Sequence, residues 1–240
     1  FHQGLGSPSF YTSITIDQPA KVYLGSRVGA WLGGPQPFSS ADVSMMIGNN
    51  PLTSHYAWQG SVPPFSPSRR LRDAKARGLK LICVDPRRTM VAQLADIHLQ
   101  VRPGEDATLL AGMLRLILDE ELHDREFCER HVTGLAELHR AIADFTPEHV
   151  ARRSDVPVAE LIAAARLFAH GPRGVATTGT GAEMATRGSL TEHLVQTLNI
   201  VCGRFCREGE VAPYPRVLSA ATPRKAQVQP LAPLWGEGLG

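Results

Sequence analysis

Apolar residues fall into two patterns along this chain. Nearly continuous apolar runs at 42–47, 79–84 and 174–178 are typical of strands covered on both faces, and 96–101 alternates apolar and polar positions. A helix-like segment separates the first two runs within about forty residues, which indicates a parallel pair with a right-handed crossover. We expect helices at 21–32, 68–77, 107–118, 124–131, 135–144, 147–153, 157–170 and 190–201. The pattern predicts an α/β fold with a Rossmann-like, doubly wound, mostly parallel sheet flanked by helices.

The chain is expected to divide near residue 172. Residues 1–172 form the Rossmann-like domain in this interpretation. Residues 173–240 then supply part of a second α/β domain, which begins with the strand 174–178 and ends in an irregular tail rich in Pro and Ala. The opening FHQGLGSPSF is neither a Met start nor a signal peptide, so we expect a fragment of a longer protein.

Composition excludes several classes of protein. Hydrophobic residues make up 43% of the chain, as in ordinary globular domains. The 25 Lys and Arg residues nearly balance 23 Asp and Glu, and this net charge of +2 argues against nucleic acid as a partner. No run approaches the ~20 apolar residues that cross a bilayer, so we expect no membrane insertion by this segment. The sequence does not fix the cellular compartment of the protein, although the cytoplasm is favoured over the periplasm.

Two groups of residues could bind a ligand or a metal, but each has a simpler structural explanation. Five basic residues on one expected helix suit a solvated surface face; they are Arg69, Arg70, Arg72, Lys75 and Arg77. The four cysteines suit reduced thiols in the core or in loops; they are Cys83, Cys128, Cys202 and Cys206. The last two are spaced as C-x3-C, and two ligands do not make a zinc or iron–sulfur site.

Three expected strands end in short polar loops. The first runs into GNNP (48–51), the second into DPRRT (85–89) and the third reaches PGED (103–106). In open α/β sheets, ligands bind at the carboxyl ends of the strands. Three such loops from one short region predict a cradle for a single elongated polar ligand, which we interpret as a nucleotide.

Each loop residue also has a structural explanation. The GNNP loop is either a tight turn or a set of amide donors close to the ligand. Asp85 stands where an acid commonly accepts a hydrogen bond from a ribose hydroxyl, while Arg87 and Arg88 suit either phosphate or a surface ion pair. Asp106 is an N-cap for the following helix, or a carboxylate that accepts from N1 and N2 of guanine.

In this order and spacing, GNNP, VDPRRT and ADIHLQVRPGED with the following LLAGML helix resemble the molybdopterin oxidoreductase family. That family includes formate dehydrogenases, nitrate reductases and dimethyl sulfoxide reductase. The resemblance continues through GTGAEMATRG to LNIVCGRFCREGE and covers roughly 42–210. It implies a molybdenum bis(molybdopterin guanine dinucleotide) cofactor and two-electron oxygen-atom or hydride-type transfer. It also implies a small-molecule redox substrate and an electron-transfer partner or subunit.

The resemblance assigns specific residues to the cofactor. They are Gly48, Asn49, Asn50, Pro51, Ser54, Asp85, Pro86, Arg87, Thr89, Gly104, Asp106, Gly179 and Gly181. Met184 and Ala185 depart from the Gln and His that members often place there, in a loop that touches the second dinucleotide. Members supply a Cys, selenocysteine, Ser or Asp to the metal from a loop before the first strand. Asp17 is the carboxylate available in SITIDQPAK, and is either an oxygen ligand for a high-valent metal or an ordinary loop acid.

Two other functions remain open at this stage. A cofactor-free structural relative, such as the large iron–sulfur subunit of respiratory complex I, fits the departures at Met184 and Ala185. An unrelated nucleotide-binding module would use Asp85 for a ribose, but no G-x-G-x-x-G follows the first strand. An iron–sulfur cluster is expected only in a preceding part of the protein, and we expect the fragment to be inactive alone.

Overall fold

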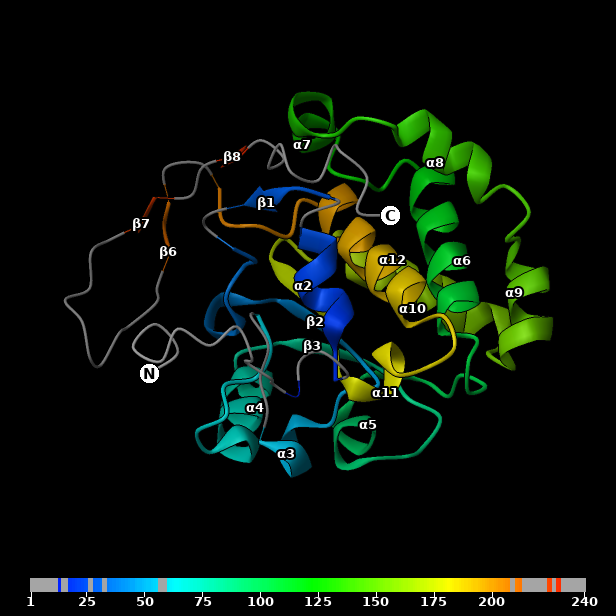
Figure 1. Cartoon of the computed structure of the whole chain (residues 1–240). Helices are drawn as coiled ribbons and strands as arrows, with labels where there is room; N and C mark the ends of the chain where they lie inside the picture. Colours follow the sequence, from blue (N-terminus) through cyan, green and yellow to red (C-terminus); the bar gives the residue numbers. More distant parts are fainter. Residues whose placement is uncertain are drawn as a thin grey trace, which may run out of the picture.

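A four-stranded parallel sheet forms the centre of the protein (Figure 1). This computed structural model describes residues 13, 17–25, 28–31, 34–55, 60–207, 210–212, 224–225 and 228–229. The strands are β2 (Val43–Ile47), β3 (Lys80–Val84), β4 (Ile97–Leu99) and β5 (Gly174–Thr178). Their order across the sheet is β4-β3-β2-β5. The predicted α/β fold with a mostly parallel sheet is confirmed.

The register aligns the carboxyl ends of the central strands. Ile47 at the end of β2 pairs with Val84 of β3 on one side and with Thr178 of β5 on the other. The chain steps from β2 through β3 to β4 in one direction, and then returns to β5 on the opposite side of β2. Such a reversal is a topological switch point, which in open α/β sheets lies beside the ligand crevice.

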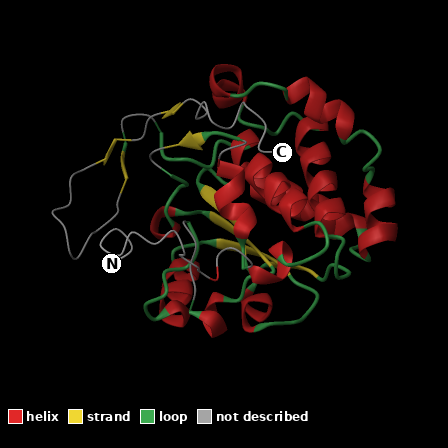
Figure 2. Cartoon of the chain, viewed as in Figure 1, coloured by secondary structure: helices red, strands yellow, loops and turns green. Residues whose placement is uncertain are grey.

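Helices cover both faces of the sheet (Figure 2). They are α2 (Pro19–Gly25), α3 (Pro51–Ser54), α4 (Pro67–Ala76), α5 (Met90–Leu94), α6 (Asp106–Asp119), α7 (Arg125–His131), α8 (Leu135–Ala141), α9 (Pro147–Ser154), α10 (Val158–His170), α11 (Thr180–Glu183) and α12 (Gly188–Val201). A 3-10 turn spans Phe38–Ser40. Two-residue strands pair as β1 (Ala30–Trp31) with β8 (Val228–Gln229), and β6 (Val211–Ala212) with β7 (Arg224–Lys225).

The two hydrophobic cores follow from the alternation of side chains along each strand. Met45 and Ile82 point to the face packed by α6, α10 and α12. Met46 and Leu81, each one position away from these, lie in the other core with α4 and α5. The nearly continuous apolar runs therefore fill two cores at once, which is the doubly wound arrangement that the sequence predicted.

Three expectations about elements need correction. The helix expected at 21–32 ends at Gly25, and Ala30–Trp31 is instead a strand; Gly29, with φ +88°, stands between the two. The helix expected to reach residue 144 ends at Ala141. The strand expected to open a second domain, Gly174–Thr178, is hydrogen-bonded to β2 along its whole length and shares its sheet. The division of the chain into domains near residue 172 stays a prediction.

Two expectations about the chain as a whole can be examined in the described residues. No helix among them has the length and apolar character needed to cross a bilayer. The four cysteines are buried free thiols, as expected. Most of the Pro- and Ala-rich tail, including 213–223 and 230–240, lies outside the described residues.

Candidate functional site

The candidate site lies at the carboxyl edge of the sheet, where short helices follow the strands. α3 follows β2, α5 follows β3 and α11 follows β5, and α3 and α5 contact each other (Figure 1). Parallel strands end at the same edge, so the loops that the sequence singled out are brought together here.

The first loop turns sharply after β2. Gly48 has φ +53°, a conformation that favours glycine, and its N–H donates to Val84 O at 2.8 Å. Asn49 is buried and its Nδ2 donates to Ser61 Oγ at 3.4 Å. Asn50 precedes α3, and its Oδ1 is buried with no hydrogen-bond partner among the described residues. A buried acceptor without a partner is costly unless a ligand supplies a donor.

The same loop continues into α3. Pro51 occupies the first turn of this helix, where its missing N–H is harmless. The Ser54 hydroxyl donates to Asn50 O at 3.2 Å and stays exposed. His55 ends the turn in the left-handed conformation. The GNNP loop is therefore the tight turn that the sequence allowed, and Asn50 Nδ2 donates to Thr53 Oγ1 at 3.0 Å within it. Its role as a set of amide donors to a ligand stays a prediction.

Two glycine loops meet at the switch point. Gly179 N donates to Ile47 O at 2.9 Å, and a Cβ at position 179 would lie 2.3 Å from Gly48 O. A Cβ at Gly48 would in turn lie 2.8 Å from Ala182 N. Gly181 has more space around it, because a Cβ added at position 181 would lie 3.5 Å from Gly48 O. The GNNP loop and the GTG loop thus pack backbone against backbone.

The second loop is organised by Asp85. Its side chain is buried, and Oδ1 accepts a hydrogen bond from Arg87 N at 2.8 Å, as in an Asx turn. His98 Nε2 donates to Asp85 O at 2.9 Å, which ties the loop to β4. Pro86 is exposed, and Thr89 caps α5 by accepting from Ala92 N. The loop therefore has a fixed shape before any ligand binds.

The two arginines of this loop project from the edge. Arg87 and Arg88 are both exposed. Within the described part of the chain neither forms an ion pair with Asp or Glu. The alternative that they serve a surface ion pair therefore finds no support in these contacts, and both guanidinium groups are available to an anion.

The third loop brings a buried carboxylate to the start of α6. Asp106 is the first residue of the helix and only 8% exposed, and the N-cap position belongs to Glu105, so the N-cap expectation for Asp106 is wrong by one residue. Burial raises the pKa of Asp106, and the negative charges of Asp85 and Glu105 raise it further. The carboxyl groups of Asp85 and Asp106 therefore lie close enough for their charges to interact. Gly104 has φ +87° and permits the turn before the helix.

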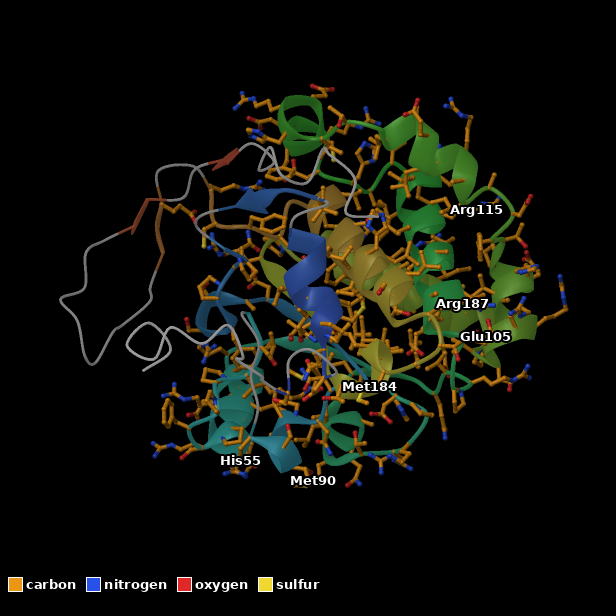
Figure 3. The ribbon with its side chains drawn as sticks, viewed as in Figure 1. His55, Met90, Glu105, Arg115, Met184 and Arg187 are labelled. Atoms are coloured by element: carbon orange, nitrogen blue, oxygen red, sulfur yellow. The ribbon has the colours of Figure 1, made fainter. Side chains whose placement is uncertain are left out.

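Glu105, which the sequence did not single out, immediately precedes Asp106 at the start of α6. Its carboxylate accepts from Thr108 Oγ1 at 2.6 Å and from Arg153 Nη2 at 2.7 Å. Burial alone would raise the pKa of Glu105, but these hydrogen bonds and the charges of Arg153 and Arg187 lower it. Figure 3 shows Arg187 and Glu105 on the same side of the molecule, with Met184 nearby. The loop after α11 thus approaches the start of α6.

Asp17 lies beside the loop that follows β5. Thr180 Oγ1 donates to Asp17 Oδ1 at 3.2 Å, which places the candidate metal ligand at the carboxyl edge with the other loops. Among the described residues no group of three or more His, Cys, Asp or Glu side chains gathers to hold a metal. Met184 is 64% exposed, so it contributes little to the packing of this loop. Asp17 stands near the site as a single carboxylate.

Comparisons with known proteins identify the family of this chain. A family model described as molybdopterin oxidoreductase matches residues 9–233. The thiosulfate reductase molybdopterin-containing subunit PhsA of Salmonella typhimurium is 28% identical over 205 residues, which are 85% of this chain and 26% of that protein. The nitrate reductase of Symbiobacterium thermophilum is 32% identical over 188 residues, 74% of this chain and 24% of that protein.

A solved structure shows the same fold. Acetylene hydratase from Pelobacter acetylenicus matches with a TM-score of 0.69 and 28% sequence identity, over 84% of this chain and 26% of that chain. The chain spans about a quarter of the length of the relatives it matches.

Proposed function

The chain belongs to the molybdopterin oxidoreductase family, and from this membership we propose that it binds the guanosine diphosphate end of a molybdopterin guanine dinucleotide. Membership implies a pterin cofactor that carries molybdenum or tungsten. The guanine dinucleotide form, the contacts and the reaction are our proposal. The chain is one part of a longer two-electron oxidoreductase in this account.

The buried carboxylate of Asp106 carries the proposal. Two carboxylate oxygens match the adjacent N1–H and N2–H donors of guanine, and such charge-assisted hydrogen bonds are strong. Asp106 forms no ion pair with any described residue, and its position at the N-terminus of α6 favours a negative charge. The backbone N–H of Asp106 is one donor to this carboxylate, and the remaining acceptor sites of a buried carboxylate without a cation suit donors from a ligand. The site fits a guanine base.

The neighbouring loops suit the rest of the nucleotide. Asp85 Oδ1 is engaged by Arg87 N, while Oδ2 takes no hydrogen bond from a described residue and suits a ribose hydroxyl. The exposed guanidinium groups of Arg87 and Arg88 suit phosphate. The unpartnered Oδ1 of Asn50 belongs to the loop at the same edge and suits a hydroxyl or amide donor of the ligand. Pro86, Thr89, Pro51 and Ser54 shape these loops.

The second dinucleotide is assigned to the loop after β5. Gly179 and Gly181 bring that backbone close to the GNNP loop, and we assign Asp17 as an oxygen ligand to the metal. When bound, the metal–pterin group supplies two-electron oxygen-atom or hydride-type transfer to a small-molecule substrate, with electrons exchanged with a partner or subunit. This chain's residues bind and orient the group. An iron–sulfur cluster, where the protein has one, belongs outside this chain, and the 240 residues alone are inactive.

Cofactor analysis of the purified protein tests the proposal. We expect molybdenum or tungsten, pterin fluorescence and guanine nucleotide on release in the native protein, and loss of all three in Asp106→Ala. Glu137→Ala, an exposed change on α8, serves as the control and retains the cofactor. A native protein without metal and pterin would favour the cofactor-free relative. Normal loading of Asp106→Ala would overturn the guanine assignment.

A further inference from the structure

A buried polar cluster lies between α2, β5, α11 and α12, beside the loop that follows β5. It ties the segment 17–21 to the end of β5 across more than 150 residues of sequence. Its members are Gln18, Lys21, Thr178, Glu183, Glu192 and Gln196. None of them has a role in the function proposed above, although several are titratable.

An ion pair forms the centre of this buried polar cluster. The Lys21 ammonium contacts Glu183 Oε1, and the side chains are 1% and 0% exposed. Glu183 Oε2 also accepts from Lys21 N at 3.3 Å, and Lys21 Nζ donates to Gln18 Oε1 at 2.6 Å. Water cannot stabilise either charge at this depth, so removing Lys21 leaves the charge of Glu183 buried without its ammonium partner. The pair therefore locks α2 onto α11.

The hydrogen bonds of Thr178 determine where a proton resides. Its hydroxyl lies 3.3 Å from Glu183 Oε1 and also contacts Glu192 Oε2. A hydroxyl has one proton, so it donates to one carboxylate only, and the other carboxyl group must donate to it. Glu183 is balanced by Lys21, which makes Glu192 the protonated member. Burial raises the pKa of Glu192, in agreement with this assignment.

The cluster extends from this pair to Asp17. Gln18 Nε2 donates to Thr180 Oγ1 at 2.9 Å, and Thr180 Oγ1 donates to Asp17 Oδ1 at 3.2 Å. Gln196 Nε2 donates to Glu192 Oε1 at 2.7 Å at the opposite end. α2 also packs against α12. A continuous series of hydrogen bonds thus links Glu192 in α12 to Asp17 at the sheet edge, and its direction reverses at Glu183, which accepts from both Thr178 and Lys21.

We propose that Lys21 and Glu183, supported by a protonated Glu192, are positioning residues that clamp the segment carrying Asp17 onto the loop after β5. The purpose of the clamp rests on the proposed function, because Asp17 is the candidate metal ligand. The existence of the clamp does not depend on the proposed function, because all of its contacts lie within this chain. The clamp fixes the candidate ligand relative to the GTG loop before any cofactor binds.

Hydrogen exchange of the purified protein tests the clamp directly. In Lys21→Met and in Glu183→Gln we expect backbone amides in 17–25 to exchange at least tenfold faster, while those of α6 keep their native rates. The double variant K21M/E183Q removes both charges and should exchange more slowly than either single variant, since no buried charge is left unpaired. Glu137→Gln, in an exposed ion pair on α8, is the matched control.

Unchanged exchange in 17–25 in both single variants would overturn the clamp, as would a double variant that exchanges faster than both. Should the single variants fail to fold, Glu192→Gln keeps the proposal testable. Its amide donates to Thr178 as a protonated acid does, so we expect native exchange and the loss of one protonated-carboxyl band from the infrared spectrum. No lost band, or exchange as fast as in Glu183→Gln, contradicts the assignment of the proton.

The cofactor-loaded protein separates this proposal from the function on which it rests. We expect Glu183→Gln to change the EPR spectrum of the metal, and Glu192→Gln to leave it as in the native protein. Faster exchange in 17–25 with an unchanged metal spectrum would confirm the clamp and remove Asp17 as a ligand. Native exchange in 17–25 would refute the clamp whatever the metal does.

Discussion

Gly179 lies against Gly48 so closely that neither has room for a side chain. A Cβ at 179 would stand 2.3 Å from Gly48 O, and the nearest described atom to a Cβ at 48 is Ala182 N at 2.8 Å. This contact joins the first loop of the sheet to the last, across the switch point between β2 and β5. The two loops proposed for the cofactor therefore form one rigid edge.

Gly179→Ala is expected to lower the free energy of unfolding by about 1–3 kcal/mol, because the added methyl group forces backbone apart. The φ of Gly179 is −111°, so the effect is steric and involves no strained conformation. Gly181→Ala is the matched control in the same loop, since its methyl group would make ordinary contacts at 3.5 Å. Urea unfolding of the two variants gives the comparison. Equal stability of the two would contradict the close approach.

Stability should respond to pH through Glu192. Burial raises the pKa of its carboxyl group above the ordinary value of 4.5. A raised pKa in the folded state stabilises the protein below the unfolded pKa, and this contribution is lost as pH rises through the folded pKa. Glu192→Gln removes the titration. We therefore expect this variant to gain stability relative to the native protein as pH increases from 4.5, measured by thermal unfolding in matched buffers.

No gain of Glu192→Gln with pH would show that Glu192 titrates normally in the fold. The control is Glu137→Gln on the exposed face of α8, which should follow the native protein at every pH.

Native thiols should resist alkylation. Burial raises the pKa of Cys83 to about 12 and that of Cys202 to about 12, and the pKa of Cys128 to about 11. Thiolate is the reactive form, so iodoacetamide at pH 8 should label these cysteines only after unfolding. Mass spectrometry of native and urea-unfolded protein measures the difference. Rapid labelling of Cys202 in the native protein would contradict its burial.

Local sequence patterns predicted the sheet well. Elements that depend on contacts between distant parts of the chain were not predicted. The apolar runs of β2 and β3 are covered on both faces, which is why their pattern identified them. The strand Ala30–Trp31 pairs with Val228–Gln229, and nothing near residue 30 could indicate a partner so distant in sequence. The correct edge of the sheet was predicted because parallel strands must end together.

The polar residues were harder to predict. Asp106 was expected as an N-cap, but the helix starts one residue earlier than that role requires and Glu105 precedes it. The Lys21–Glu183 pair joins residues 162 positions apart, so no spacing in the sequence reveals it. Site residues on adjacent loops follow from topology, whereas buried ion pairs depend on packing that only the folded structure shows.

Recognition of guanine by Asp106 also makes binding depend on pH. Guanine donors need the ionised carboxylate, and burial raises the pKa of Asp106 above its ordinary value of 3.8. We expect the affinity of the cofactor-free protein for GDP to fall as pH is lowered through this raised pKa. Calorimetry across the range measures it, and GDP binding that is equally tight at low pH would contradict a role for the charged group.

The proposed function depends most on Asp106, and replacing guanine by another base in the nucleotide tests this role most directly. In Asp106→Asn the side chain presents one of its two N–H donors and its carbonyl acceptor to the edge of the base, which suits xanthine and opposes guanine. Loss of charge-assisted hydrogen bonds worth about 1.5–3 kcal/mol should weaken GDP binding roughly tenfold to hundredfold. Calorimetry of native protein and variant with GDP and XDP should show this loss together with tighter XDP binding. Unchanged GDP affinity in Asp106→Asn, with no gain for XDP, would contradict it.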